Sequence, residues 1–186
     1  MNNTTPINKL IILDRDGVIN LDSDDYIKNV DEWIAIPSSL RAIARLNKAG
    51  YKVAVATNQS GISRGYFNTA TLTMMHKKME LELANVGGFI DALEFCPDHP
   101  DNAGPNRKPQ PGMANKLLTL FNAIPEDTFF VGDSKSDINC ALNACCKPVL
   151  VLTGKGLKTQ SSGLSNKIPI YDDLSQFVDY LLEIKT

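Results

Sequence analysis

The sequence predicts an α/β fold with a doubly wound parallel sheet of the Rossmann type. Several short stretches are apolar throughout, as in strands that are buried on both faces of a sheet. Amphipathic stretches with helical spacing alternate with them. The chain has 186 residues, which is enough for one domain with a sizeable core. We therefore expect a single domain over residues 1–186, with helices on both faces of the sheet.

Five apolar stretches are the expected strands. They lie at residues 9–14, 52–57, 89–95, 128–133 and 148–153. Each is bounded by turn-forming or polar residues, and the third is expected to be short.

Five amphipathic segments are the expected helices. They lie at residues 38–50, 69–88, 112–123, 134–146 and 173–184. The first has apolar residues at helical spacing, with Ser38 or Ser39 as its cap and Gly50 as its end. Two segments are expected to be loops: the proline-rich stretch at 96–111, and the polar, Gly/Ser-rich stretch at 154–167, which we expect to be a mobile surface loop.

The composition limits the kinds of molecule that this chain is expected to bind. The net charge is −2, so no basic surface for nucleic acid or anionic lipid is expected. No apolar run approaches the ~20 residues that span a bilayer, and the N-terminus has no signal-peptide pattern. The four cysteines are clustered in a way that does not suggest disulfides. We expect a cytoplasmic monomer that acts on a small molecule.

Polar residues follow three of the predicted strands. Asp14 and Asp16 follow the first strand, residues 57–60 (TNQS) end the second, and Asp133 ends the fourth, with Asp137 one helical turn later. Ligands bind at the carboxyl ends of strands in open parallel sheets, so these groups should converge on one cleft. Arg107 and Lys108 precede the next helix and can bring positive charge to it.

The expected cleft suits phosphoryl transfer. Its metal-ligating side chains offer only oxygen, which favours Mg²⁺ over zinc. One carboxylate could attack phosphorus, and a second could protonate the leaving oxygen and then activate water. Each motif alone has a structural explanation, as a turn, a helix cap or a solvated charge pair. Four of them in order, each at a strand end or helix entrance, favour a catalytic site.

The sequence resembles the haloacid dehalogenase superfamily of phosphatases along nearly its whole length. The four family motifs appear as "LDRDGVIN", "TNQSGISRGYF", "RKPQPGM" and "VGDSKSDI". The second and third are similar to those of the heptose-bisphosphate and histidinol-phosphate phosphatase subfamily. The resemblance implies a Mg²⁺-dependent phosphatase of this fold, without a large cap domain, that removes one phosphate of a heptose bisphosphate for lipopolysaccharide biosynthesis.

The resemblance also implies residue roles. Asp14 would be the nucleophile and a metal ligand. Asp16 would be the general acid/base, with its backbone carbonyl on Mg²⁺. Asp133 would complete the metal site, and Asp137 would orient metal-bound water or Lys108. The remaining roles are phosphoryl binding, expected of Thr57 and Lys108, and substrate binding, expected of Asp22, Asn58, Gln59, Ser60, Arg64 and Arg107.

The loop before Lys108 departs from the subfamily. Many members hold a structural zinc there with a Cys-x-His and a Cys-x-Cys pair. Here Cys96 and His99 offer two ligands, whereas Asp98, Gly104 and Asn106 stand at the other positions. Because structural zinc needs four nitrogen or sulfur ligands, we predict that this loop binds no zinc.

The locations of six further residues are predicted from the sequence around them. Tyr26 and Trp33, in the loop after the first motif, are expected to pack against the domain rather than to contact substrate. His76 is expected at the surface, beside two lysines. We expect three cysteines to pack in or near the core as small hydrophobic side chains: Cys140, Cys145 and Cys146.

Three alternatives to the heptose-bisphosphate phosphatase stay open. The nearest is a histidinol-phosphate phosphatase or a broader sugar-phosphate phosphatase. A phosphate-accepting signalling module also places acidic clusters at strand ends, but it has no need of a general acid/base at Asp16. A catalytically inactive binding protein is disfavoured because every expected catalytic position is filled.

Overall fold

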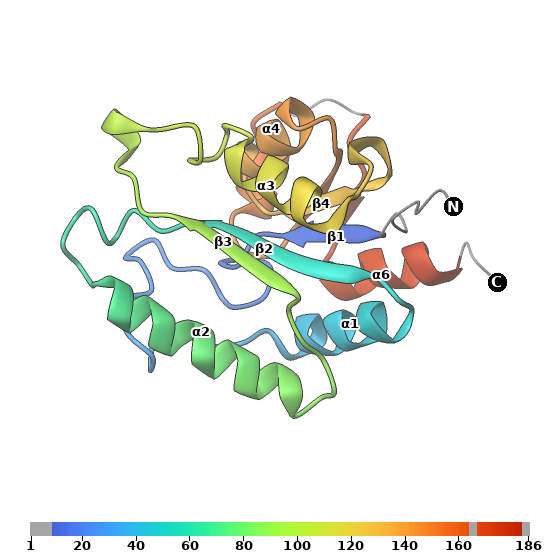
Figure 1. Ribbon diagram of the computed structural model, residues 1–186, viewed down its shortest axis with the longest axis horizontal. Coiled ribbons are helices and arrows are strands. Elements are labelled where there is room, and N and C mark those ends of the chain that lie inside the picture. Colours follow the sequence, from blue (N-terminus) through green and yellow to red (C-terminus); the bar gives the residue numbers. More distant parts are fainter. Residues whose placement is uncertain (1–8, 164–166, 184–186) are drawn as a thin grey trace, which may run out of the picture.

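The computed structural model describes residues 9–163 and 167–183. Its centre is one six-stranded sheet in the order β3-β2-β1-β4-β5-β6 (Figure 1). All neighbouring strands are parallel. The strands are β1 (Leu10–Leu13), β2 (Lys52–Asn58), β3 (Ala92–Cys96), β4 (Phe129–Gly132), β5 (Lys147–Val151) and β6 (Ile170–Tyr171).

Helices cover both faces of the sheet, as predicted. They are α1 (Pro37–Lys48), α2 (Thr69–Ala84), α3 (Gly112–Phe121), α4 (Lys135–Asn143), α5 (Gly156–Ser161) and α6 (Leu174–Glu183). In Figure 1, α1, α2 and α6 lie on one face, and α3 and α4 lie on the other. Two 3₁₀ turns, Pro100–Asn102 and Pro125–Asp127, complete the elements. No helix in the described part of the chain is both long and apolar enough to cross a membrane.

Strand β1 divides the core into two halves. Ile11 and Leu13 pack with residues of α1, α2 and α6, whereas Leu10 and Ile12 pack with residues of α3 and α4. All four are at most 1% exposed. Because both faces are covered, the strand is apolar at every position, which explains why the sequence shows no alternation there.

The strand order places a switch point at β1. Its neighbours are β2 on one side and β4 on the other, so the chain winds in opposite directions from this strand. In a doubly wound sheet, ligands bind beyond the carboxyl ends of the strands at such a point. The residues that directly follow β1 and β4 therefore lie side by side.

The start of α1 differs from the prediction. The helix begins at Pro37, and its cap residue Ile36 makes no side-chain cap hydrogen bond. Proline fits the first helical position because its fixed φ suits the helix and its missing N–H needs no partner. Ser38 donates to Asp173 Oδ2, and Ser39 donates to the Val18 carbonyl, so both serines make tertiary contacts and neither is the cap.

The segment at 154–167 was expected to be a mobile loop, which is wrong for its first half. Residues Gly156–Ser161 form α5, with Gly156 and Thr159 buried. The polar composition hid this helix, because only one of its faces is covered. Residues 164–166 lie outside the described part. The two-residue strand β6 was also missed, because so short a strand leaves no pattern in the sequence.

The cysteines are free, and two of the three core assignments hold. Cys140 and Cys146 are buried, whereas Cys145 is exposed. Cys145 lies just beyond α4 with φ of 58°, and this left-handed turn directs the chain into β5. The expectation that Cys145 packs in the core is therefore wrong.

Trp33 anchors the irregular loop between β1 and α1. It is 0% exposed and belongs to the core cluster that α1, α2 and α6 form with the sheet. Lys78 of α2 donates to the carbonyls of Val30 and Trp33 at 3.0 and 2.7 Å. The prediction that Trp33 packs against the domain is confirmed.

Trp33→Ala should therefore lower the free energy of unfolding by about 3–5 kcal/mol, because it removes a fully buried indole and leaves a cavity. Urea unfolding measures the change. Leu120→Ala, at a site that is 65% exposed, is the control and should cost less than about 0.5 kcal/mol. A loss below about 1 kcal/mol at position 33 would contradict the anchoring role.

Candidate active site

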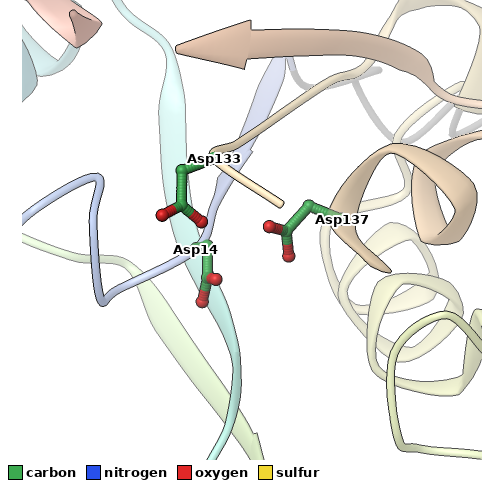
Figure 2. Close-up of side chains that lie close together, drawn as sticks. All are labelled: Asp14, Asp133 and Asp137. Atoms are coloured by element: carbon green, nitrogen blue, oxygen red, sulfur yellow. The ribbon is translucent and has the colours of Figure 1, made fainter. Parts of the chain in front are cut away.

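Three buried carboxylates meet beyond the ends of β1 and β4. One oxygen each from Asp14, Asp133 and Asp137 lies within 4.8 Å of the others (Figure 2). Asp14 directly follows β1 and continues its pairing, since its N–H donates to the Val131 carbonyl of β4. Asp133 directly follows β4, and Asp137 lies in the first turn of α4. The predicted convergence of these groups is confirmed.

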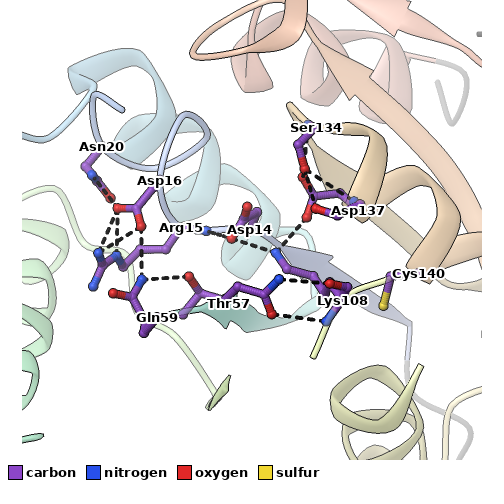
Figure 3. Close-up of polar contacts among 12 residues, drawn as sticks. Asp14, Arg15, Asp16, Asn20, Thr57, Gln59, Lys108, Ser134, Asp137 and Cys140 are labelled. Atoms are coloured by element: carbon purple, nitrogen blue, oxygen red, sulfur yellow. Dashed lines mark hydrogen bonds and ion pairs between the residues drawn. The ribbon is translucent and has the colours of Figure 1, made fainter. Parts of the chain in front are cut away.

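Lys108 supplies the cation of this cluster. Its ammonium lies 2.8 Å from Asp14 Oδ1 and 2.6 Å from Asp137 Oδ1 (Figure 3). Lys108 is 2% exposed, and burial by itself lowers the pKa of an ammonium; the two carboxylates outweigh it and raise the pKa above its ordinary value. The lysine is therefore charged throughout the physiological range.

Both oxygens of Asp137 are already in use. Oδ1 contacts Lys108, while Oδ2 accepts from the N–H and the hydroxyl of Ser134 at 3.0 and 2.5 Å. Asp137 and Ser134 form a capping box at the start of α4. These contacts place Asp137 against Lys108, which is the geometry expected for one of the two roles that the family resemblance implies for it.

One ammonium does not balance three carboxylates. Burial, together with the charge of Asp137, raises the pKa of Asp14 to about 7 although Lys108 opposes the shift. Burial and the charges of Asp137 and Asp14 raise the pKa of Asp133 to about 8. The carboxylates of Asp14 and Asp133 thus carry more negative charge than Lys108 balances. A hard divalent cation, which prefers oxygen ligands, fits there.

Two glycines leave room for Asp133. Gly17 has φ of +80° and Gly154 has φ of +55°, and a Cβ at either residue would lie 2.1 Å from Asp133 Oδ2. The N–H of Lys155 donates to the same oxygen at 2.7 Å. The loops after β1 and β5 therefore close on Asp133 from both sides, and only glycine permits this approach.

Asp16 lies apart from the carboxylate cluster. Its side chain turns to Arg15, Asn20 and Gln59, which together we name the Asp16 clamp (Figure 3). Burial acts to raise the pKa of Asp16, but the Arg15 guanidinium and the hydrogen bonds of the clamp outweigh it and lower the pKa. Asp16 is therefore ionised at neutral pH.

The clamp connects Asp16 to Thr57. Gln59 Nε2 donates to both Asp16 Oδ2 and Thr57 Oγ1 at 2.9 Å. Because the Thr57 oxygen accepts this bond, its hydroxyl proton can donate toward the cleft. Gln59 was expected to bind substrate, and the structure gives its amide this connecting contact as well.

Asn58 holds the loop that carries Lys108. Its amide donates to the Lys108 carbonyl and accepts from the Lys108 N–H, both at 3.0 Å. This pairing fixes the lysine backbone against the end of β2. The peptide bond from Lys108 to Pro109 is cis.

A cleft of about 340 Å³ joins these groups, a volume suited to a small molecule. Five of the six predicted substrate-binding residues line it: Asp22, Asn58, Gln59, Ser60 and Arg107. Arg64 does not; it is exposed, and its guanidinium lies 5.9 Å from the ring centroid of Tyr26. The expectation for Arg64 is not supported by this geometry, because Arg64 does not line the cleft.

Sequence reasoning missed several lining residues. Tyr26 was expected only to pack, yet it lines the cleft and also contacts Tyr66 edge-on. Lys155 lines the cleft, and its ammonium lies 2.8 Å from Asp22. Its position, four residues after the end of β5, was a usable signal, since ligands gather at the carboxyl ends of parallel strands.

His76 was expected at the surface, which is wrong. It is half-buried, and its Nε2 lies 3.4 Å from Nη1 of Arg15. Its spacing from buried Leu72, Met79 and Leu83 places it on the covered stripe of α2, and that spacing was readable from the sequence.

The loop that carries the altered zinc positions satisfies its polar groups internally. Asp98 Oδ2 accepts from the Gly104 N–H, and the Asp98 carbonyl accepts from Arg107. His99 Nδ1 accepts from the Asp101 N–H. The absence of zinc stays a prediction.

Similarity to known proteins shows the class to which this chain belongs. Residues 105–177 match the family model for HAD-hydrolase-like proteins. A phosphatase from Pseudomonas aeruginosa is 50% identical over 174 residues, covering 94% of this chain and 98% of its own length. The chain belongs to the haloacid dehalogenase-like hydrolases, and the predicted fold and enzyme class are confirmed.

The relatives share one particular name. The Pseudomonas protein is a D-glycero-beta-D-manno-heptose-1,7-bisphosphate 7-phosphatase, as is one from Neisseria meningitidis serogroup B that is 49% identical and covers 96% of this chain and 97% of its own. A crystal structure of D,D-heptose 1.7-bisphosphate phosphatase from B. bronchiseptica, complexed with magnesium and phosphate, superimposes with a TM-score of 0.92. It is 47% identical, and the match covers 95% of this chain and 99% of that one.

The raised carboxyl pKa values predict how magnesium and pH act on stability. In the metal-free chain, folded Asp14 and Asp133 bind more protons than the unfolded chain between about pH 4 and pH 8. Their contribution to stability is therefore present at low pH and is lost as pH rises through about 7 to 8. Bound Mg²⁺ replaces these protons, so it should raise Tm much more at about pH 8 than at about pH 5.

Thermal unfolding with and without MgCl₂ at the two pH values measures this difference. Asp31→Asn, at an exposed position outside the cleft, should behave like the unmodified chain. An equal or larger magnesium effect at the lower pH would contradict the assignment.

Metal analysis of protein purified without chelators tests whether the loop before Lys108 binds zinc. We expect less than about 0.1 zinc per chain, because the loop lacks four suitable ligands. One zinc per chain would overturn the prediction.

Proposed function

We propose that this chain is a Mg²⁺-dependent phosphatase that hydrolyses the 7-phosphate of D-glycero-D-manno-heptose 1,7-bisphosphate. The observation that carries the proposal is the joint placement of Asp14, Asp133 and Lys108 at the floor of one cleft. The name shared by relatives of 49–50% identity supports the substrate. It favours this substrate over histidinol phosphate.

Asp14 is the proposed nucleophile. Its Oδ1 accepts from the Arg15 N–H at 2.7 Å and contacts Lys108, and these two contacts fix the carboxylate at the lining of the cleft. Attack forms a bond from this carboxylate to phosphorus, and the bond from phosphorus to the sugar oxygen breaks. Asp14, Asp133 and the backbone carbonyl of Asp16 would hold Mg²⁺, whose charge would keep Asp14 ionised and stabilise the phosphoryl oxygens.

Asp16 is the proposed general acid/base. It gives its proton to the departing sugar oxygen and then takes one from the water that hydrolyses the aspartyl-phosphate. Because it is ionised in the free chain, it must first gain a proton, and the negative phosphate that arrives beside it raises its pKa. Thr57 and Lys108 donate to the transferring phosphoryl group.

The rest of the cleft holds the remainder of the substrate. Besides Lys108, the cations Arg107 and Lys155 line it, and they can contact the phosphate that is retained. Asp22, Ser60 and the amides of Asn58 and Gln59 can contact sugar hydroxyls. The reaction serves the heptose precursor of lipopolysaccharide, and we propose that the chain acts in the cytoplasm as a monomer; its four free cysteines suit a reducing compartment.

The test is phosphate release from heptose 1,7-bisphosphate, histidinol phosphate and hexose phosphates. The highest kcat/KM is expected for the heptose bisphosphate, and a higher value for histidinol phosphate would reverse the assignment. Asp14→Asn should lower kcat by more than about 10³-fold, because it removes the nucleophile but keeps the shape. Asp31→Asn is the matched control, and retained activity in Asp14→Asn would refute the proposed nucleophile.

A further inference from the structure

Arg15, which holds Asp16, also makes a partly buried contact that the proposed mechanism does not use. The Arg15 side chain is 0% exposed, and its Nη1 lies 3.4 Å from Nε2 of His76. The two residues are 61 positions apart, one at the second position after β1 and the other in the middle of α2. The contact therefore joins the loop of the catalytic aspartates to a helix on the face of the sheet.

The direction of this hydrogen bond follows from the chemistry of arginine. A guanidinium has only donors, so Nε2 of His76 must be the acceptor and the ring proton must lie on Nδ1. Burial, followed by the charge of Arg15, lowers the pKa of His76 to about 4, although Asp16 acts against the shift. The imidazole is therefore neutral, as an acceptor has to be.

His76 is itself held firmly. Leu72 and Met79, one turn before and one turn after it on the same helix, are buried. Its ring packs edge-on against Phe95 of β3, with centroids 6.4 Å apart and planes at 62°. The acceptor thus sits on a rigid element rather than on a loop, which suits a residue that fixes another side chain.

Arg15 divides its donors between His76 and Asp16. Nε donates to Asp16 Oδ1 at 3.0 Å, and Nη2 reaches both carboxylate oxygens at 2.7 and 2.9 Å. This bidentate pairing fixes the plane of the carboxylate. Without an acceptor at His76, Nη1 would be a buried donor without a partner, and Arg15 would turn to satisfy it. Asp16 would then lose the orientation that the clamp gives it.

We propose that His76 is a positioning residue for proton transfer by Asp16, acting through Arg15. The inference rests on the proposed function, in which Asp16 protonates the departing sugar oxygen. It adds that α2 sets the orientation of this carboxylate. A sugar alkoxide is a poor leaving group that needs the proton, whereas 4-nitrophenolate leaves without one.

The test compares two substrates in variants of His76. In His76→Leu, which fills the space but has no acceptor, kcat/KM for heptose 1,7-bisphosphate should fall roughly tenfold, part of the 10²–10⁴-fold that general acid catalysis contributes. The value of kcat/KM covers the steps up to departure of the leaving group and leaves out the hydrolysis of the aspartyl-phosphate that both substrates share. For 4-nitrophenyl phosphate, kcat/KM should therefore change less than about twofold. His76→Gln, whose Oε1 can take the place of Nε2, should recover most of the loss.

The control is Lys77→Leu, the same new side chain at the next, exposed position of α2; it should match the unmodified chain. Equal losses of kcat/KM for both substrates in His76→Leu, no loss at all, or no recovery in His76→Gln would overturn the proposal. If His76→Leu does not fold, His76→Gln against His76→Asn gives the same comparison, because the shorter amide does not reach Arg15.

A second measurement does not depend on turnover. Long-range ¹H–¹⁵N spectra should show His76 neutral and protonated on Nδ1 from about pH 6 to 8, where an unperturbed histidine changes charge. A ring protonated on Nε2, or charged in this range, would overturn the contact. If the unmodified chain hydrolyses neither substrate, the proposed function fails, and these spectra still decide whether His76 accepts from Arg15.

Discussion

The ammonium of Lys108, buried between Asp14 and Asp137, is the interaction on which the rest of the site depends. A lone buried charge is strongly unfavourable, and the pair of carboxylates makes it tolerable. The same pairing leaves Asp14 and Asp133 with more negative charge than the lysine balances. This excess of negative charge explains why a divalent cation fits the cluster. With that cation bound, the cleft can admit an anionic phosphate beside the carboxylates.

The fold supplies this arrangement through the switch in strand order at β1. The ends of β1 and β4 bring Asp14 next to Asp133, and the end of β2 brings the Asn58 amide that holds the backbone of Lys108. The glycines that flank Asp133 let two loops close on it. The carboxylates of Asp14, Asp133 and Asp137 are thus attached to strand ends or to the first turn of a helix. Lys108 lies in the loop between β3 and α3, and its backbone is held there by Asn58.

Much of this arrangement could be predicted from the sequence, because buried strands are apolar at every position and polar residues directly follow them. Asp14 and Asp133 were found in that way, whereas Lys108 was found from its position just before a predicted helix. What the sequence could not show were contacts between segments far apart, such as Arg15 with His76, and the covered face of the polar helix α5. His76 was misplaced because its lysine neighbours in the sequence outweighed its helical spacing, although only the spacing reports which face is covered.

A crystal structure of the chain grown with magnesium chloride tests the central claim most directly. The account predicts one ion bound to the carboxylates of Asp14 and Asp133, with Lys108 still between Asp14 and Asp137 and both oxygens of Asp137 still engaged. An ion ligated by Asp137 with the lysine displaced, or no ion between residues 14 and 133, would contradict it.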